Sequence, residues 1–365
     1  MTGLFTPMDL DGLRLPNRVW MSAMTRTRAS DDNVPTALMA EYYAQRADAG
    51  LIVTECTAVS EQGKGIINGP GIWRRDQIAG WRRVTDAVHK AGGHIFCQLW
   101  HCGRVAHPDM RNGELPVAPS PLPAQGKLKF PDREVDFPVP RALAADEIPP
   151  IIEDFAKATG RAREAGFDGV ELHGANGYLH DQFLQDISNQ RTDDWGGSIE
   201  RRARLILDTV DAMIAAWSAG RVGVRLGPSI SLYGMGDSNP LATFGYVVRE
   251  LDRRRIGCLT MLEPNKNDRE KGVAIERVAK TFRPMTSAPL VANTGFDKDS
   301  GNRAIEEGEA DAIAYGVAFL ANPDLAERFR HGAPLNKPDP STFYGRGPKG
   351  YVDYLALSGQ RVGAA

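Results

Sequence analysis

Cysteine is scarce in this chain of 365 residues, which has four cysteines, at positions 56, 97, 102 and 258. Four are too few for the disulfide scaffold of a small secreted protein. No apolar run approaches the ~20 residues that a membrane-spanning helix needs. The first seven residues hold no basic stretch followed by an apolar one, so we expect no signal peptide. Together these absences predict a reduced, cytoplasmic protein that does not bind membranes.

The chain also lacks an excess of charge of either sign. Lysine and arginine number 44 and aspartate and glutamate 46, which gives a formal net charge of −2. This balance disfavours a basic surface for nucleic acid or for an anionic membrane. Hydrophobic residues make up 42% of the chain and charged residues 25%, an ordinary globular composition. We therefore expect a small-molecule partner and no nucleic acid, with monomer and homodimer both open.

What the chain does contain is an alternation of short β-branched runs with longer helical patterns. Eight runs predict strands, at residues 18–21, 51–55, 94–99, 169–173, 222–226, 258–262, 289–293 and 312–315. The helical patterns lie at residues 36–48, 77–91, 148–165, 199–217, 242–255, 272–282, 297–307 and 323–331. Eight strand–helix units predict an α/β protein with a (β/α)8 barrel, a single domain over residues 1–365. An open doubly wound sheet is the alternative.

Two segments stand outside this alternation. Residues 101–147 contain eight prolines, too many for helix interiors or central strands. Because this long loop follows the third strand, we expect a capping insertion over the carboxyl-terminal mouth of the barrel. Residues 4–16 predict a hairpin that turns at Asp11-Gly12 and closes the opposite end.

The strongest local feature follows the fourth predicted strand, where the sequence reads His173-Gly174-Ala175-Asn176-Gly177-Tyr178. His173 and Asn176 are both donors and could converge on one oxygen, which is how enzymes stabilise a developing oxyanion. Tyr178 would need a turn at Gly177 to join them. The same residues also suit a hydrogen-bonded histidine at a strand end and a tyrosine that only packs.

Two other patterns are weaker. His101, Cys102, His107 and Asp109 lie close together, but no regularly spaced second cysteine pair accompanies them, so we expect no metal site. Residues 345–350 match G-x-G-x-x-G, yet they neither follow a predicted strand nor open a helix, so we expect a turn. The loops after the seventh and eighth strands, at 293–296 and 315–317, are better candidates for holding a phosphate.

Over nearly its whole length the chain resembles the old yellow enzyme family of flavin-dependent ene-reductases. The matching stretches stand in the family's order and spacing. They include Pro16-Asn17-Arg18-Val19, Met24-Thr25-Arg26, Gln98-Leu99-Trp100-His101-x-Gly103-Arg104, His173-Gly174-Ala175-Asn176-Gly177-Tyr178-Leu179 and Ala321-Asn322-Pro323-Asp324-Leu325. The resemblance implies a (β/α)8 barrel that binds FMN at its carboxyl-terminal mouth and takes hydride from NADPH or NADH.

The resemblance also implies a role for individual residues. His173 and Asn176 would bind the carbonyl or nitro oxygen of an activated alkene, and Tyr178 would donate the proton. The substrate pocket would include Ile66, Trp100 and Tyr344. The residues expected beside FMN are Ala23, Met24, Thr25, Cys56, Gln98, Arg225, Thr294, Gly295, Gly316 and Val317.

Three positions depart from the family pattern. Val317 stands where an arginine usually pairs with the FMN phosphate, Ile66 where an aromatic residue is common, and Ala23 where proline is usual. Loss of a charge-assisted contact at Val317 would cost ~1.5–3 kcal/mol of FMN affinity. The expected function is an NAD(P)H-dependent reductase of activated alkenes. The alternatives are a reductase of nitro compounds, nitrate esters or quinones, and, more remotely, a flavin-free binding barrel.

Overall fold

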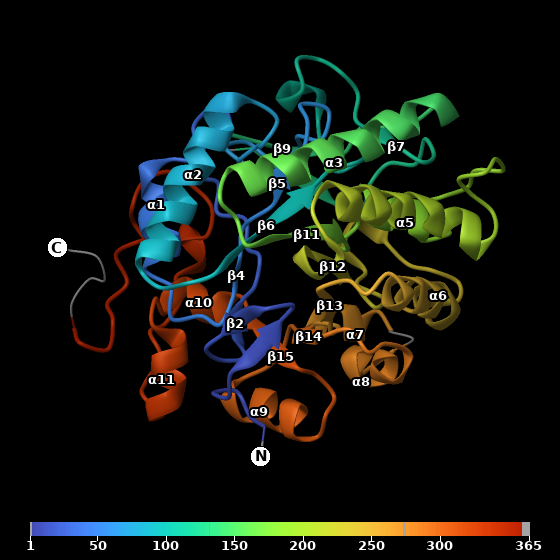
Figure 1. Ribbon diagram of the computed structural model, residues 1–365. Helices are drawn as coiled ribbons and strands as arrows, with labels where there is room; N and C mark the ends of the chain where they lie inside the picture. Colours follow the sequence, from blue (N-terminus) through green and yellow to red (C-terminus); the bar gives the residue numbers. More distant parts are fainter. Residues whose placement is uncertain (1, 131, 273–274, 360–365) are drawn as a thin grey trace.

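Eight parallel strands pair in a ring in the computed structural model, which describes residues 2–130, 132–272 and 275–359 (Figure 1). The order is β11–β12–β13–β14–β15–β3–β4–β6, and β6 pairs back to β11, which closes the barrel. The predicted (β/α)8 barrel is therefore confirmed. Its strands are β3 (Val19–Met21), β4 (Ile52–Val53), β6 (Ile95–Trp100), β11 (Gly169–Gly174), β12 (Val222–Leu226), β13 (Cys258–Leu262), β14 (Leu290–Asn293) and β15 (Ala312–Tyr315).

The second strand of the barrel is interrupted. After β4, a further short strand β5 (Thr57–Ala58) pairs with the later half of β6. Residues 54–56 therefore leave the regular ladder at the carboxyl-terminal end of the barrel.

Helices surround the barrel and bury one face of each against it (Figure 1). Local signals fix where they begin: the Ser198 side chain accepts the N–H of Arg201, and Asn239 accepts that of Ala242. The longer helices are α1 (Ala37–Ala44), α2 (Arg75–Lys90), α3 (Ile148–Glu164), α5 (Ile199–Ala216), α6 (Pro240–Arg253) and α9 (Lys298–Glu306). The shorter ones are α4 (Leu179–Leu184), α7 (Lys266–Glu270), α8 (Val278–Phe282), α10 (Val317–Ala321) and α11 (Leu325–His331).

The predicted helix at 272–282 is shorter than expected. It begins at Val278 as α8, and Val273 and Ala274 lie outside the described residues. Helices α4, α7 and α10 were not predicted. Each has only five or six residues, too few to show a helical period in the sequence.

The hairpin predicted near the start of the chain is present as strands β1 (Met8–Leu10) and β2 (Leu13–Leu15). Asp11 and Gly12 both have positive φ, 50° and 82°, as a tight two-residue hairpin turn requires. Leu10 and Leu15 pack with Trp20 in a small cluster that also holds inward-facing residues of several barrel strands. The hairpin thus closes the amino-terminal end of the barrel.

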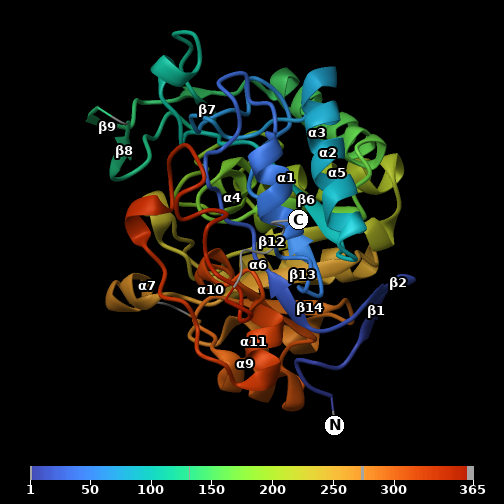
Figure 2. The same cartoon turned by 90° about the vertical axis from the view of Figure 1, so that its left-hand side faces the viewer.

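Residues 101–147 form two small strand pairs instead of a structureless loop, with Pro131 outside the described residues. Strands β7 (Val117–Ala118) and β10 (Arg141–Ala142) pair in parallel, and β8 (Lys127–Lys129) and β9 (Glu134–Asp136) form a hairpin. Figure 2 shows the β8–β9 hairpin at the opposite side of the molecule from β1–β2. Among the described residues, no helix combines the length and the apolar character that crossing a membrane demands.

Candidate active site

A hydrogen-bonded network of polar side chains crosses the barrel interior below its carboxyl-terminal mouth. Gln98 on β6 donates from Nε2 to Oε1 of Glu171 at 2.7 Å, and Thr260 on β13 donates to Oε2 of Glu171 at 2.8 Å. All three side chains are buried. Buried polar groups persist in a core when they are paired in this way. This hydrogen-bonded network therefore fixes the side chains on one side of the mouth.

Cys56 links this hydrogen-bonded network to the residues that follow the first barrel strand. Its Sγ donates to Oε1 of Gln98 at 3.3 Å, and it also hydrogen-bonds to the side chain of Thr25. Burial raises the pKa of Cys56 to about 12, so its sulfur is a neutral S–H donor. The structure thus brings together three residues expected beside the flavin: Thr25, Cys56 and Gln98.

Arg225 lies on the other side of the mouth, near the end of β12. Its Nη2 donates to Oδ1 of Asn293 at 2.8 Å and its Nη1 to the Ser22 hydroxyl at 3.2 Å. Burial lowers the pKa of Arg225, while the charge of Glu171 acts in the opposite direction. Its Nε–H is buried and has no partner among the described residues. Arg225 therefore supplies a fixed positive charge with an unused donor.

His173 is paired in register with Arg225 across β11 and β12. Burial and the nearby charge of Arg225 lower the pKa of His173 well below its usual value, so its imidazole is neutral. Its Nδ1 is buried without a hydrogen-bond partner in the described part of the chain. A neutral histidine with an unused ring nitrogen at the mouth of a barrel is available to a ligand.

Tyr178 stands between His173 and Trp100. The ring of Tyr178 lies 5.0 Å from that of His173 and 5.1 Å from that of Trp100, both edge-to-face. Burial raises the pKa of Tyr178 well above its usual value, so its hydroxyl keeps its proton at neutral pH. The Trp100 Nε1–H is another buried donor with no partner within the described ranges.

The turn that aims Tyr178 is built from two residues with positive φ. Asn176 has φ 58° and Gly177 has φ 75°. The N–H of Gly177 donates to the Asp181 carboxylate at 2.8 Å, and Gln182 Nε2 donates to the Gly177 carbonyl at 2.6 Å. A Cβ at Gly177 would lie 2.9 Å from Met235, so the position also needs glycine for space. The predicted turn at Gly177 is present.

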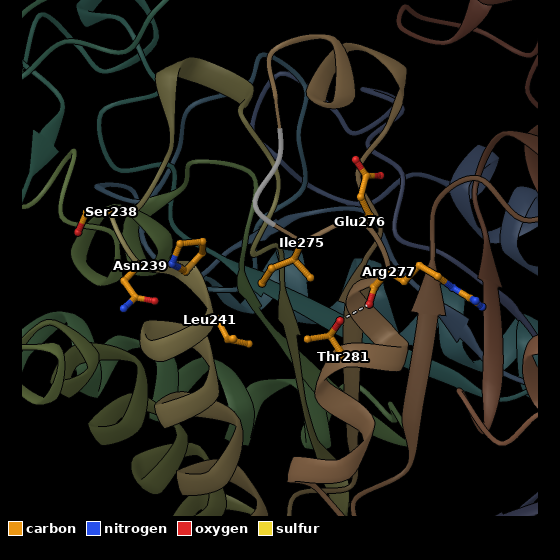
Figure 3. Close-up of a pocket in the computed structure, with 8 residues that line it drawn as sticks. Ser238, Asn239, Leu241, Ile275, Glu276, Arg277 and Thr281 are labelled. Carbon is orange, nitrogen blue, oxygen red and sulfur yellow. Dashed lines mark hydrogen bonds between the residues drawn. The ribbon is translucent and has the colours of Figure 1, made fainter.

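Asn176 opens onto a small cavity of about 200 Å³ above the ends of β12 to β14, which Thr294 also lines. A larger hollow of about 600 Å³ lies between the start of α6 and residues 275–281 (Figure 3). None of the predicted site residues lines that larger hollow. The chemistry-bearing side chains gather at the barrel mouth, so the mouth is the candidate active site. Convergence of His173 and Asn176 on one oxygen stays a prediction.

The two loops expected to hold a phosphate lie at the ends of β14 and β15. Thr294 and Gly295 have φ 81° and 82°, and a Cβ at Gly295 would meet nothing within 4 Å. A Cβ at Gly316 would lie 3.0 Å from Sδ of Met24, so these two predicted residues are neighbours. Val317 is the first residue of α10, and its side chain is 44% exposed. The loops offer open backbone but no charge at position 317.

The remaining predicted residues occupy the rim. Ile66 packs, as Tyr178 does, on the buried cluster that contains Cys56 and Trp100. Ala23 is half-buried at the end of β3. Tyr344 is 67% exposed, on a segment that is held to the mouth by a hydrogen bond from the Gly345 N–H to Thr27 Oγ1 at 2.9 Å.

Sequence reasoning missed Tyr233, which follows β12 in a 3-10 turn (Leu232–Gly234). Its ring lies 6.3 Å from that of Tyr178 and 5.5 Å from that of Phe137, and it hydrogen-bonds to the Tyr178 side chain. Its backbone has φ 59°, which is uncommon for a bulky residue. The dipeptide Tyr233-Gly234 after a barrel strand was the available signal.

Comparisons with known proteins agree with this geometry. A family model described as the NADH:flavin oxidoreductase / NADH oxidase family matches residues 3–336. The chain is 42% identical to 12-oxophytodienoate reductase 1 of Oryza sativa subsp. japonica over 359 residues, which cover 97% of this chain and 93% of that protein.

Solved structures are similar along nearly the whole chain. The structure of morphinone reductase matches with a TM-score of 0.93 and 45% identity, and the match covers 99% of each chain. An old yellow enzyme homologue from Zymomonas mobilis matches with a TM-score of 0.93 and 42% identity over 97% of this chain and 100% of the other. The barrel is thus shared with these solved structures.

Proposed function

The chain belongs to the NADH:flavin oxidoreductase / NADH oxidase family, that of the old yellow enzymes, and is an oxidoreductase; on this premise we propose that it is an FMN-dependent ene-reductase. Its substrates would be small alkenes conjugated to a carbonyl or nitro group, and NADH or NADPH would supply the hydride. Fold alone would not support this assignment, because one barrel hosts many reactions. The support comes from the donors gathered at the mouth.

The residues at the mouth fit FMN. Thr25, Gln98 and Arg225 present donors and acceptors that would hold the polar edge of a flavin ring. The unpartnered Nε–H of Arg225 in particular lacks the acceptor that such an edge provides. Thr294 and Gly295 both have positive φ and Gly295 borders open space, so the backbone N–H groups of this loop would bind the phosphate.

When bound, FMN supplies the redox chemistry, accepting a hydride from the nicotinamide nucleotide and delivering one to the β-carbon of the alkene. His173 and Asn176 would hold the activating oxygen of the substrate, where negative charge grows as hydride arrives. Fixed donors at such an oxygen contribute ~3–4 kcal/mol to lowering the barrier. Because His173 is buried, its one N–H donor would reach the substrate oxygen without competition from solvent.

Tyr178 would donate its hydroxyl proton to the α-carbon. Its raised pKa keeps that proton in place until the transfer. The edge-to-face contacts with His173 and Trp100 restrict the ring to one orientation, which sets the direction of the hydroxyl. The observation that carries the proposal is this cluster of His173, Tyr178 and Trp100 with two unpartnered ring nitrogens.

A spectroscopic experiment tests the proposal. The purified protein should show the visible absorption of oxidised flavin, lose it anaerobically with NADH or NADPH, and regain it when 2-cyclohexenone is added. Rates of recovery with 2-cyclohexenone, a nitroalkene and a nitrate ester would rank the substrate classes. A colourless protein that takes up no added FMN would overturn the proposal.

A further inference from the structure

Glu171 is a buried carboxylate that the proposed reaction does not use. It lies on β11 two residues before His173, and therefore on the same inner face of the barrel. Its register partner on β6 is Gln98, and both of its oxygens accept hydrogen bonds, from Gln98 Nε2 and from the Thr260 hydroxyl. A carboxylate that is only 1% exposed is expensive to keep unless it has a purpose or compensating partners.

The hydrogen bond from Gln98 determines how its amide is oriented. A primary amide has a donor end and an acceptor end, and a half-turn about its last bond exchanges them. An ionised carboxylate only accepts, so Nε2 of Gln98 has to face Glu171, while the Cys56 thiol donates to Oε1 from the other side. The second N–H and the second lone pair of Gln98 are then fixed in direction.

Glu171 also acts on the charge at the mouth. Its negative charge raises the pKa of Arg225, so the two side chains interact through the barrel interior. Thr260, the other partner of Glu171, is paired in register with Arg225. Glu171 thus accepts a hydrogen bond from the Gln98 amide and interacts electrostatically with the Arg225 guanidinium.

We propose that Glu171 is a positioning residue that fixes which edge of the Gln98 amide faces the flavin and that offsets the positive charge of Arg225. This inference rests on the FMN binding proposed above. Both oxygens of Glu171 are taken by Gln98 and Thr260, so Glu171 would act through these two neighbours. Its effect is therefore expected on the flavin's reduction potential and affinity more than on substrate binding.

The test is the reduction potential of the FMN-loaded protein, measured by equilibration with a reference dye. Glu171→Gln removes a buried negative charge and lets Gln98 turn over, so Arg225 stabilises the reduced flavin more strongly. We expect the two-electron equilibrium to move at least tenfold toward reduction, which corresponds to about 30 mV. The affinity for FMN, measured by fluorescence quenching, should fall.

Glu309→Gln is the matched control, because it makes the same change at another buried carboxylate, one that pairs with Arg277 and Lys280. It should leave the potential unchanged. Thr260→Val keeps the charge of Glu171 but removes one of its donors, so the potential should move in the opposite direction. The last comparison is a double-mutant cycle of Gln98→Met and Glu171→Gln. The shift in potential of the double variant should be smaller than the sum of the shifts of the two single variants.

The outcomes separate this inference from the proposed function. If the unaltered protein binds no FMN, the proposed function fails. If it binds FMN and the potential of Glu171→Gln equals that of the unaltered protein, the positioning role alone fails. Should Glu171→Gln not fold, Thr260→Val decides: an unchanged potential in that variant overturns the inference.

Discussion

Arg225 and His173 are neighbours at the mouth, and one is charged while the other is neutral. Arg225 stays positive and its proximity, together with burial, keeps the imidazole of His173 neutral. A neutral imidazole donates through one nitrogen and accepts through the other. Since the pKa of His173 is well below its usual value, the rate of alkene reduction should show no inflection near pH 6.5 that arises from this residue.

Replacement of the tyrosine at the mouth tests its role as an acid. In Tyr178→Phe, we expect the reduction of bound flavin by NADH or NADPH to stay normal, because no proton is needed from Tyr178 in that step. Transfer to 2-cyclohexenone should slow by about 10²–10⁴-fold, the usual contribution of a general acid. Stopped-flow absorbance measures each half-reaction separately. Tyr246→Phe, on the half-buried face of α6, is the control and should leave both rates unchanged.

The uncharged residue at position 317 predicts weakened phosphate binding. Val317 is the first residue of α10 and lies next to Gly316, at the loop expected to hold the FMN phosphate. An arginine there would add a charge-assisted contact worth ~1.5–3 kcal/mol. Val317→Arg should therefore lower the FMN dissociation constant by roughly 10- to 150-fold, measured by titration of the apoprotein. Equal constants for Val317→Arg and the unaltered protein would mean that position 317 does not contact the phosphate; Val317→Met serves as a size control.

At the scale of elements, the mouth is held by contacts between segments far apart in sequence. Arg104, which follows β6, donates from its side chain to the carbonyls of Leu122 and Tyr233, at 3.2 Å and 3.4 Å. The N–H of Gln125 also donates to the Tyr233 carbonyl. The proline-rich segment and the turn after β12 are thus joined by the buried guanidinium of Arg104 and by the backbone of Gln125. This junction lies beside Tyr178, whose ring packs on both segments.

The loss of that guanidinium should loosen the segment over the mouth. In Arg104→Met, the carbonyl of Leu122 loses this donor, at a cost of ~1–3 kcal/mol for a group left unpaired, while the Tyr233 carbonyl keeps the N–H of Gln125. We expect KM for 2-cyclohexenone to rise several-fold and limited proteolysis to cut faster within residues 122–130. Arg141→Met, which removes an exposed partner of Glu147, is the control. Identical digestion of Arg104→Met and the unaltered protein would show that the segment is held by other contacts.

For the whole molecule, the barrel followed from the sequence because each strand is a short apolar run and each helix an amphipathic one. The residues at strand ends, such as His173 and Arg225, followed from the rule that barrels keep reactive groups there. Glu171 and Thr260 were missed because their importance depends on register between strands, which no local pattern records. Tyr233 was missed because the contacts that hold its backbone come from Arg104 and Gln125, which lie more than one hundred residues away in the sequence.

Stability against acid is a property of the whole fold, and buried histidines contribute to it. His180 on α4 packs edge-to-face on Phe155 at 4.7 Å, and its Nε2 lies 3.1 Å from the Thr209 hydroxyl. Burial lowers the pKa of His180 from 6.5 to about 3. Between these values the unfolded chain binds a proton that the folded protein does not. The stabilising contribution is therefore complete above pH 6.5 and declines as the pH falls toward 3.

Other buried groups act in the opposite direction, so a single variant has to isolate the effect. Burial raises the pKa of Asp48, Glu55 and Asp181 to about 7, and their contribution falls as the pH rises through the range below 7. His180→Gln removes the proton that His180 binds in the unfolded chain below pH 6.5. The stability difference between this variant and the unaltered protein should shrink below pH 6.5 by at most about 1.4 kcal/mol per pH unit.

Urea unfolding of the FMN-saturated protein at about pH 8 and about pH 5 measures this difference. Phe155→Leu is the control, because it disturbs the same packing contact without removing a titrating group, so its destabilisation should be the same at both pH values. If the difference for His180→Gln is as independent of pH as that for Phe155→Leu, His180 takes up its proton in the folded state as readily as in the unfolded one, and burial does not hold it neutral.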